Sequence, residues 1–292
     1  MPIAILTDST CDLTLEQLDS LKVFMLPLTV SINGKDYVDV IDIDAHKFYE
    51  LSEQSEELPK SSQPSPGTIK KKLQEIQDAG FDECIAIFIS SGLSGTAHTA
   101  EQVIKNFTGM KTYFVDSKTG SAAHGFLVEQ AALMRDRGLD AKTIYEHILE
   151  AKQYSKIFFC PATLENLVKG GRASKFKAFA ASLLDIKIIV SVDEAGNAIL
   201  AHKMRGIEKA KRTLIQSFKD FVEKHAGNEV PWVRFVNTGD EKSMLAIKEG
   251  IEKLNIPYID KGVSYPGPVI TTHVGTDAFG FAICKPPLGS EG

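Results

Sequence analysis

The sequence predicts an α/β protein with two domains, the first built on a mostly parallel sheet with flanking helices. Three observations indicate this fold class. Short apolar runs alternate with amphipathic stretches through the first half of the chain, which is typical of βαβ units. Several of these runs end in short polar loops. Near Lys156 the pattern changes, and strands begin to follow one another directly.

The N-terminal half is expected to form four strands and six helices. Asn33-Gly34 predicts a hairpin turn, because both residues tolerate positive φ. Ser65 and Pro66 supply an N-cap and a first helical residue. The expected strands are 3–6, 23–30, 84–89 and 112–115, and the expected helices are 13–21, 46–51, 66–79, 97–107, 122–136 and 141–153.

The C-terminal half is expected to form six strands and two helices. A turn that contains Gly196 joins two of the strands. The expected strands are 156–160, 186–192, 198–204, 232–237, 269–273 and 281–284, and the expected helices are 207–225 and 242–254. We therefore predict an N-terminal α/β domain over 1–155 and a C-terminal α/β domain over 156–292.

The composition is that of a globular protein, with 43% apolar and 24% charged residues. It excludes a disordered chain, a collagen-like fibre and a coiled coil. The net charge, 33 − 38 = −5, argues against a general nucleic-acid binder, which is usually basic. No apolar stretch approaches the roughly 18 residues of a membrane span, so we expect no stable membrane insertion.

The expected location is the cytoplasm. The first residues lack the basic and apolar regions of a signal peptide. No two cysteines stand at Cys-x-x-Cys spacing, which favours reduced thiols over disulfides. The cysteines are Cys11, Cys84, Cys160 and Cys284.

Two hydroxyl-rich loops precede helices. The sharper one is Ser94-Gly95-Thr96, where hydroxyls, backbone N–H groups and the positive end of a helix dipole suit a carboxylate or phosphate. The second is the segment from Ser61 to Pro66. An ordinary N-cap with a glycine turn and a solvated linker explain the same two loops, and the sequence leaves both interpretations open.

The sequence offers no convincing nucleophile–base pair. The segment Gly92 to Thr96 resembles a nucleophile elbow but lacks the final glycine. There is no P-loop and no Gly-x-Gly-x-x-Gly after a strand. No two histidines stand at metal-ligand spacing, so no metal site is expected. His273 is expected at the end of strand 269–273, where it can donate to an anion or simply cap the strand.

Positive charge gathers between Lys169 and Arg212. This stretch holds ten Lys or Arg and four acids, a net of 10 − 4 = +6 in a chain of net −5. Such a patch suits an acidic partner or a phosphate, although a solvated helix face explains 209–212 equally well. Gly170-Gly171-Arg172 predicts a tight loop that presents a guanidinium.

The sequence resembles the DegV family of fatty-acid-binding proteins. Six segments carry the resemblance, in the family's order and over nearly the whole chain. They are Thr7-Asp8-Ser9-Thr10-Cys11-Asp12, Ser61-Ser62-Gln63-Pro64-Ser65, Ser90-Ser91-Gly92-Leu93-Ser94-Gly95-Thr96, Val115-Asp116-Ser117, Leu164-Glu165-Asn166-Leu167-Val168-Lys169-Gly170-Gly171-Arg172 and His273-Val274-Gly275.

The resemblance implies two α/β domains with a long apolar tunnel between them that holds one long-chain fatty acid. It also implies a partner, the ATP-binding catalytic subunit of a fatty acid kinase. That subunit converts the presented acid into an acyl phosphate for phospholipid synthesis. The DegV-like chain is then a carrier without catalytic residues, and its ligand is the fatty acid, with no other cofactor.

The resemblance also implies roles for individual residues. Those expected to bind the carboxylate are Ser61, Ser62, Ser94, Gly95, Thr96, His273 and Gly275. Ser61 stands where the family usually has Thr and keeps the hydroxyl. Arg172 and Arg205 are expected at the surface where the kinase docks.

One departure from the family and one alternative function remain. After His273-Val274-Gly275 the family usually continues Pro-Gly, whereas this chain has Thr276-Asp277. A carboxylate at Asp277 would weaken anion binding if it faced the ligand. The alternative function is an enzyme that acts on a small phosphorylated or carboxylated metabolite at the same loops. The preferred fatty acid and the oligomeric state are not predicted.

Overall fold

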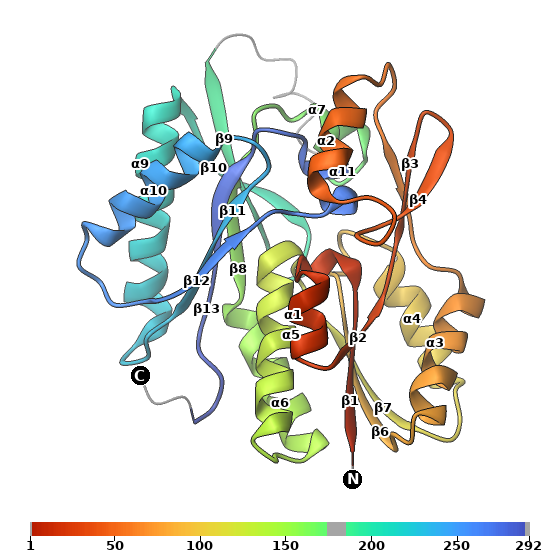
Figure 1. The fold of residues 1–292 in the computed structure, drawn as a ribbon. Coiled ribbons are helices and arrows are strands. Elements are labelled where there is room, and N and C mark those ends of the chain that lie inside the picture. Colours follow the sequence, from red (N-terminus) through yellow and green to blue (C-terminus); the bar gives the residue numbers. More distant parts are fainter. Residues whose placement is uncertain (1, 174–184, 290–292) are drawn as a thin grey trace.

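The computed structural model describes residues 2–173 and 185–289 (Figure 1). Within these residues the strands form three sheets of four, six and three strands. Lys175 and Lys177, two cations of the predicted basic stretch, lie outside the described residues.

The four-stranded sheet is entirely parallel, as predicted, in the order β2-β1-β6-β7. Its strands are β1 (Ile3–Asp8), β2 (Val23–Leu26), β6 (Glu83–Phe88) and β7 (Lys111–Asp116). Alternate residues of β1 enter different cores: Ile3 and Ile5 face one, and Ala4 and Leu6 face the other. The apolar runs are continuous because both faces of the sheet are buried.

Helices cover both faces of this sheet. α3 (Pro66–Asp78) and α4 (Thr96–Lys105) pack on one face. α1 (Leu15–Ser20), α5 (Ser121–Asp136) and α6 (Ala141–Ala151) pack on the other. Ser65 caps α3 as expected, since its hydroxyl accepts a hydrogen bond from the Thr68 amide at 3.1 Å.

The six-stranded sheet has the order β10-β9-β8-β13-β11-β12 and is antiparallel except between β11 and β12. Its strands are β8 (Lys156–Cys160), β9 (Ile186–Val192), β10 (Ala198–Arg205), β11 (Trp232–Asn237), β12 (Ile259–Ser264) and β13 (Phe279–Cys284). α9 (Ile207–Phe221) and α10 (Glu241–Glu252) cover one face. A short π-helical segment, Val222–Ala226, continues α9.

Helix α5 joins the two large sheets. Ala122, Ala123 and Phe126 belong to the core of the six-stranded sheet, whereas Leu127 and Val128 belong to that of the four-stranded sheet. The helix is therefore buried on nearly all sides, and it stands between the sheets in Figure 1. The division into domains 1–155 and 156–292 stays a prediction.

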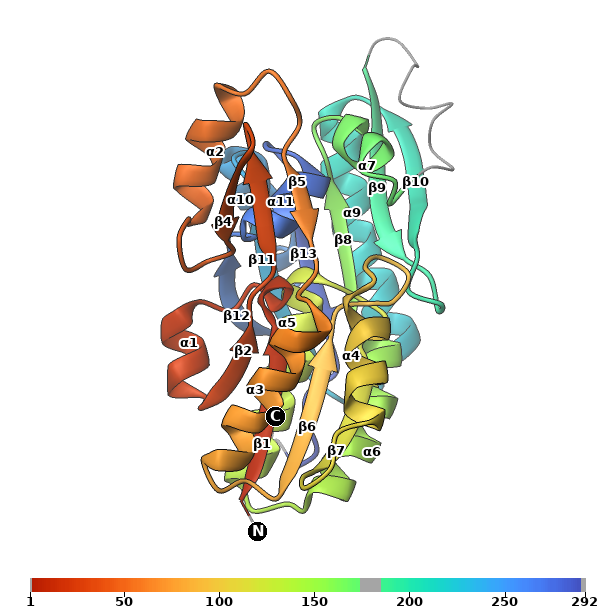
Figure 2. The ribbon, with the colours of Figure 1, turned by 90° about the vertical axis from the view of Figure 1, so that its right-hand side faces the viewer.

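The third sheet is antiparallel, in the order β4-β3-β5, with β3 (Thr29–Ile32), β4 (Lys35–Val38) and β5 (Lys60–Ser62). It lies above the four-stranded sheet in Figure 2, beside α2 (Ala45–Glu53). The predicted hairpin turn is confirmed: Asn33 and Gly34 have φ of 51° and 76°. Val269 of α11 (Pro268–Val274) packs into the core of this sheet.

Two strand predictions are wrong. Residues 23–30 form two strands in different sheets, because Pro27 between them has no N–H for a sheet ladder. Residues 269–273 lie in helix α11. Pro268 occupies the first turn of that helix, and Thr271 and Thr272 donate their hydroxyls to the carbonyls of Pro266 and Pro268 at 3.0 and 2.9 Å.

Five short elements were not predicted: β4, β5, β12, α7 (Glu165–Lys169) and the 3₁₀ turn Ser9–Cys11. A second 3₁₀ turn, Lys152–Tyr154, extends α6. Among the described helices, none combines the length and apolar character needed to cross a membrane.

Candidate ligand-binding site

An apolar cavity lies where the parallel sheet, the six-stranded sheet and α11 meet. It has about 870 Å³ of space, counting the open solvent that adjoins it. Residues after the carboxyl ends of β1 and β6 line it, an edge where open α/β sheets commonly bind ligands. The six-stranded sheet contributes Ile157, Phe159, Val190, Val192 and Val236.

Helix α11 forms another wall with Val269, Ile270 and Val274. Because these residues and those of the sheet are aliphatic or aromatic, the cavity suits an apolar ligand.

Four of the polar residues that line the same cavity come from separate elements: Ser61, Ser94, Arg172 and His273. Ser61 lies in β5, Ser94 in the loop before α4, Arg172 after α7, and His273 in the last turn of α11. Ser61 Oγ and His273 Nε2 are 2.7 Å apart and share a hydrogen bond. All four are among the predicted site residues, and only the tertiary structure brings them together.

His273 is held neutral at pH 7. Burial, and then the nearby Arg172 guanidinium, lower its pKa from 6.5 to about 3. Its Nδ1 is buried and has no hydrogen-bond partner among residues 2–173 and 185–289. A neutral imidazole donates one hydrogen bond and accepts one, and the positive charge at this end of the cavity belongs to Arg172.

The double glycine before Arg172 allows this close packing. A Cβ on Gly170 would stand 2.6 Å from His273 Nδ1, and Gly171 has φ of 78°. Arg172 Nε donates to the Leu93 carbonyl at 3.0 Å, and its Nη1 donates to the Gly170 carbonyl at 2.7 Å. The guanidinium therefore ties the Gly-Gly loop to the loop that carries Ser94.

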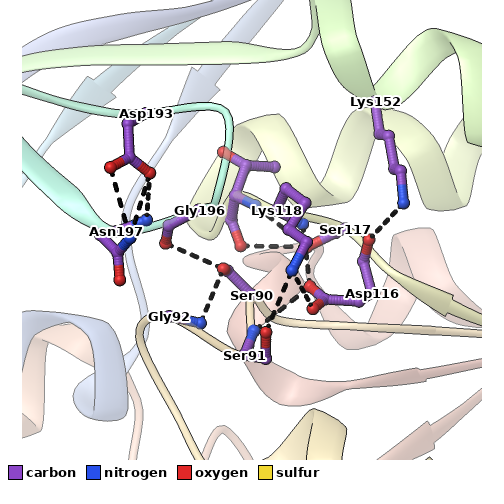
Figure 3. A network of polar contacts seen from close by, with 11 residues as sticks. Ser90, Ser91, Gly92, Asp116, Ser117, Lys118, Lys152, Asp193, Gly196 and Asn197 are labelled. Atoms are coloured by element: carbon purple, nitrogen blue, oxygen red, sulfur yellow. Dashed lines mark hydrogen bonds and ion pairs between the residues drawn. The ribbon is translucent and has the colours of Figure 1, made fainter.

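The loop that carries Ser94 is anchored at Ser90. Ser90 Oγ donates to the Gly196 carbonyl at 2.8 Å and accepts from the Gly92 amide at 3.1 Å (Figure 3). The Ser94 amide donates to the Ser90 carbonyl at 3.0 Å. Gly196 lies in the β9–β10 turn, so a turn of the six-stranded sheet holds this loop of the parallel sheet.

A second set of contacts fixes the same loop from the other side. Lys118 Nζ pairs with Asp116 at 2.7 Å and donates to Ser91 Oγ at 3.2 Å (Figure 3). The Ser91 amide donates to Asp116 at 3.2 Å. These hydrogen bonds lower the pKa of Asp116, so the carboxylate stays ionised against the burial that opposes it.

A polar groove adjoins the same residues from outside. It includes about 1780 Å³ of space, counting open solvent, and shares Ser61, Arg172 and His273 with the apolar cavity. Charged residues of both signs line it: Glu53, Glu56, Glu57, Lys60, Glu165 and Lys169. The polar end of the cavity is thus the place where an apolar chamber meets a solvated groove.

The remaining predicted residues lie elsewhere. Ser62 and Arg205 are exposed and line neither hollow. Gly95 is the N-cap residue of α4. Thr96 is buried, and its hydroxyl shares a 2.9 Å hydrogen bond with Ser94 Oγ.

The segment after His273 lies on the groove side. Gly275 and Thr276 line the polar groove only, whereas Asp277 is exposed and lines neither hollow. The Asp277 carboxylate therefore does not line the cavity beside Ser61, Ser94, Arg172 and His273.

Four further polar residues that line the cavity were not predicted as site residues: Thr10, Ser121, Ser191 and Thr238. All four are buried: Thr10 follows β1, Ser121 opens α5, Ser191 lies in β9 and Thr238 follows β11. Thr10 stands in the segment Thr7 to Asp12, so its place after the first apolar run was the signal available.

The Ser61–His273 contact also resembles a nucleophile and its base. Such a pair normally needs a third group that orients the base. Within the described part of the chain no such group contacts His273 Nδ1, and its depressed pKa makes His273 a weak base. Among residues 2–173 and 185–289, no group of three or more His, Cys, Asp or Glu is placed to hold a metal ion. The geometry suits binding of an anionic head group with an apolar tail.

Three comparisons with known proteins all point to the DegV family. The sequence model described as "Uncharacterised protein, DegV family" matches residues 2–286. A DegV domain-containing protein of Listeria monocytogenes is 31% identical over 278 residues, covering 95% of this chain and 96% of that protein. One of Streptococcus pneumoniae is 33% identical over 220 residues, covering 75% of this chain and 78% of that protein.

Solved structures match over almost the full length. A DegV family protein from Thermus thermophilus, described by its fatty acid binding, superposes with a TM-score of 0.90 at 28% identity, covering 98% of this chain and 100% of that one. DegV of Bacillus subtilis, described as a fatty acid binding protein, gives 0.84 at 29% identity, covering 98% and 99%.

Proposed function

This chain belongs to the DegV family, and from that premise we propose that it binds one long-chain fatty acid. The acyl chain occupies the apolar cavity, and the carboxylate lies at Ser61, Ser94 and His273. The observation that carries the proposal is the amphipathic cavity itself: aliphatic walls end at a hydrogen-bonded Ser61–His273 pair beside the Arg172 guanidinium.

The energetics favour a ligand of this kind. Burying a C16 chain gains about 12 kcal/mol as an upper bound, at roughly 0.8 kcal/mol per methylene. Association costs of about 4 kcal/mol or more offset part of this gain. The head group adds about 1–3 kcal/mol through charge-assisted hydrogen bonds. The acyl chain therefore supplies most of the affinity, and the polar residues orient the carboxylate.

We further propose that the chain is a non-catalytic cytoplasmic carrier. It presents the carboxylate through the polar groove to a separate ATP-binding fatty acid kinase subunit, which forms the acyl phosphate for phospholipid synthesis. Arg172, which borders both the cavity and the groove, supports this arrangement. Arg205, at the exposed end of β10, would contribute to docking of the kinase.

Mass spectrometry of the purified protein tests the binding proposal. A native spectrum should show one stoichiometric adduct, and solvent extraction should release a long-chain fatty acid. A protein that arrives empty and takes up no added fatty acid would overturn the proposal.

The Ser61–His273 contact favours one second candidate, a hydrolase. A generic ester assay separates the two functions when wild type is compared with Ser61→Ala. We expect no hydrolysis above the level of the variant. Turnover that Ser61→Ala abolishes would favour the enzyme instead.

A further inference from the structure

Two buried carboxylates accept hydrogen bonds from backbone amides at the start of α11, the helix that carries His273. The Gly267 amide donates to Asp12 Oδ1 at 2.9 Å, and the Val269 amide donates to Asp39 Oδ1 at 3.2 Å. Asp12 and Asp39 are 8% and 1% exposed. Burying a carboxylate costs free energy unless it is well hydrogen-bonded. Two buried carboxylates at the same helix end therefore suggest a specific structural role.

The second oxygen of each carboxylate binds an element of the N-terminal half. Ser121 Oγ at the start of α5 donates to Asp12 Oδ2 at 2.5 Å. Ser9 Oγ, after β1, donates to Asp39 Oδ2 at 2.6 Å. Each aspartate therefore connects α11 to the rim of the parallel sheet, and Ser121 itself lines the cavity.

Asp39 also belongs to the framework that carries Ser61. Its amide donates to the Leu28 carbonyl at 3.0 Å, just before β3. In the sheet, Val30 of β3 stands opposite Ser61 of β5. Val269 and His273 are four residues apart in α11, one turn along the same helix face. Asp39 is therefore linked both to the helix that carries His273 and to the sheet that carries Ser61.

We propose that Asp12 and Asp39 are positioning residues: they hold helix α11 so that His273 and Ser61 lie at the distance and orientation needed to receive the ligand carboxylate. This inference rests on the proposed function for the identity of the ligand. The relative position of His273 and Ser61 is a property of the ligand-free protein, so it can be measured without the ligand.

The test compares Asp39→Ala and Asp12→Ala with wild type. In ligand-free protein, the ¹⁵N resonances of the His273 ring report its hydrogen bond to Ser61, and we expect both variants to shift them. With bound palmitate ¹³C-labelled at the carboxyl carbon, we expect that resonance to shift. We expect release of the acid to be about tenfold faster, equivalent to losing roughly one charged hydrogen bond.

Two controls separate positioning from general destabilisation. Asp39→Asn keeps an acceptor for the Val269 amide and should restore both resonances. Asp140→Ala removes the cap of α6, where the carboxylate accepts from the Lys142 and Thr143 amides at 3.0 and 3.1 Å, and Asp140 lines neither hollow. It should leave both resonances unchanged although loss of the cap costs about 0.5–2 kcal/mol of stability.

Each outcome bears on one proposal. Wild-type resonances in folded Asp39→Ala and Asp12→Ala would overturn the positioning role. If those variants do not fold, Ser9→Ala, which removes one hydrogen bond from Asp39, should move the His273 ring ¹⁵N resonances away from their wild-type positions, and unchanged resonances would overturn the role. Failure of wild type to bind palmitate would instead count against the proposed function, while the His273 shifts still decide the inference.

Discussion

Ser61 and His273 stand 212 positions apart in sequence and 2.7 Å apart in space. The surroundings give the pair its character. Burial and Arg172 keep the imidazole neutral, so among the described residues that line the cavity it is Arg172 that carries a formal positive charge. A bound carboxylate would meet hydrogen bonds from neutral groups and attraction from one cation.

Ser94→Ala should impair coupling to the kinase subunit more than lipid retention. The substitution removes one hydroxyl contact, whereas the acyl chain supplies most of the binding energy. The measurement pairs extracted fatty acid content with acyl phosphate formation in a reconstituted assay. A folded variant that lost its lipid outright would contradict the account in which the cavity dominates affinity.

Arg172→Ala should keep lipid bound but weaken docking of the kinase subunit. Lys169→Ala is a suitable control, since Lys169 also borders the groove but is exposed, and its ammonium pairs with Glu165 at 2.6 Å. We expect the apparent affinity for the kinase to fall about tenfold or more in the first variant only, as for a charged interface contact. Equal kinase activity in both variants would refute the role.

Asp12→Asn should flatten the pH dependence of stability. Burial raises the pKa of Asp12 from 3.8 to about 7. Between these values the folded chain holds a proton that the unfolded chain has released, so the free energy of unfolding falls as pH rises from about 4 to 7. Asparagine removes this contribution.

Urea unfolding at pH 5 and pH 7.5 measures the effect. Asp39, whose pKa burial raises to about 6, retains a contribution of the same sign in the variant. The loss of stability between the two pH values should therefore be smaller in Asp12→Asn but not abolished. An identical change in the two proteins would contradict the assignment.

At the scale of elements, the β9–β10 turn and helix α11 decide the geometry of the head-group end. The turn meets the Ser94 loop through the Ser90–Gly196 hydrogen bond. Gly196 has φ of 84°, and a Cβ there would overlap Ser90 Oγ and stand 3.0 Å from Lys118 Cα. Contact between the two sheets at this point therefore requires glycine.

Gly196→Ala should lower the free energy of unfolding by about 1–3 kcal/mol more than Gly138→Ala. Both residues have φ of 84°, but a Cβ on Gly138 would meet nothing within 4 Å. The difference between the variants in urea unfolding isolates the overlap with Ser90 from backbone strain. Equal losses would show that the turn has room for a side chain.

The element predictions succeeded where local pattern and burial agree. Strands β1, β6 and β7 of the parallel sheet, the Asn33-Gly34 hairpin and the Ser65 cap all follow from neighbouring residues. The strand prediction for residues 269–273 was wrong, because Val269, Ile270 and two threonines favour a strand by their local propensity. Capping by Asp12 and Asp39, from the other half of the chain, helps to hold them as a helix.

For the whole molecule, α5 and the cavity couple the two large sheets. The helix packs into both cores, and residues from both sheets line the cavity. An occupied cavity adds contacts between the halves that an empty one lacks. Ligand binding should therefore stabilise the entire fold.

Removal of the bound lipid should lower Tm by about 5 °C or more. A ligand at a hundred times its Kd contributes about 2.7 kcal/mol, and a chain of this size gains roughly 2–4 °C per kcal/mol. Scanning calorimetry before and after delipidation measures the shift, and added fatty acid should reverse it. An unchanged Tm would indicate that the cavity was not the lipid site.

The sequence by itself determined the fold class, the family and four residues that the structure places on one cavity: Ser61, Ser94, Arg172 and His273. These features depend on local pattern and on short motifs. Only the tertiary structure decided that Ser62 and Arg205 lie away from both hollows, that residues 269–273 form a helix, and that Asp12 and Asp39 hold it. These outcomes depend on contacts between segments that lie far apart in the sequence, and local patterns of residues do not predict such contacts.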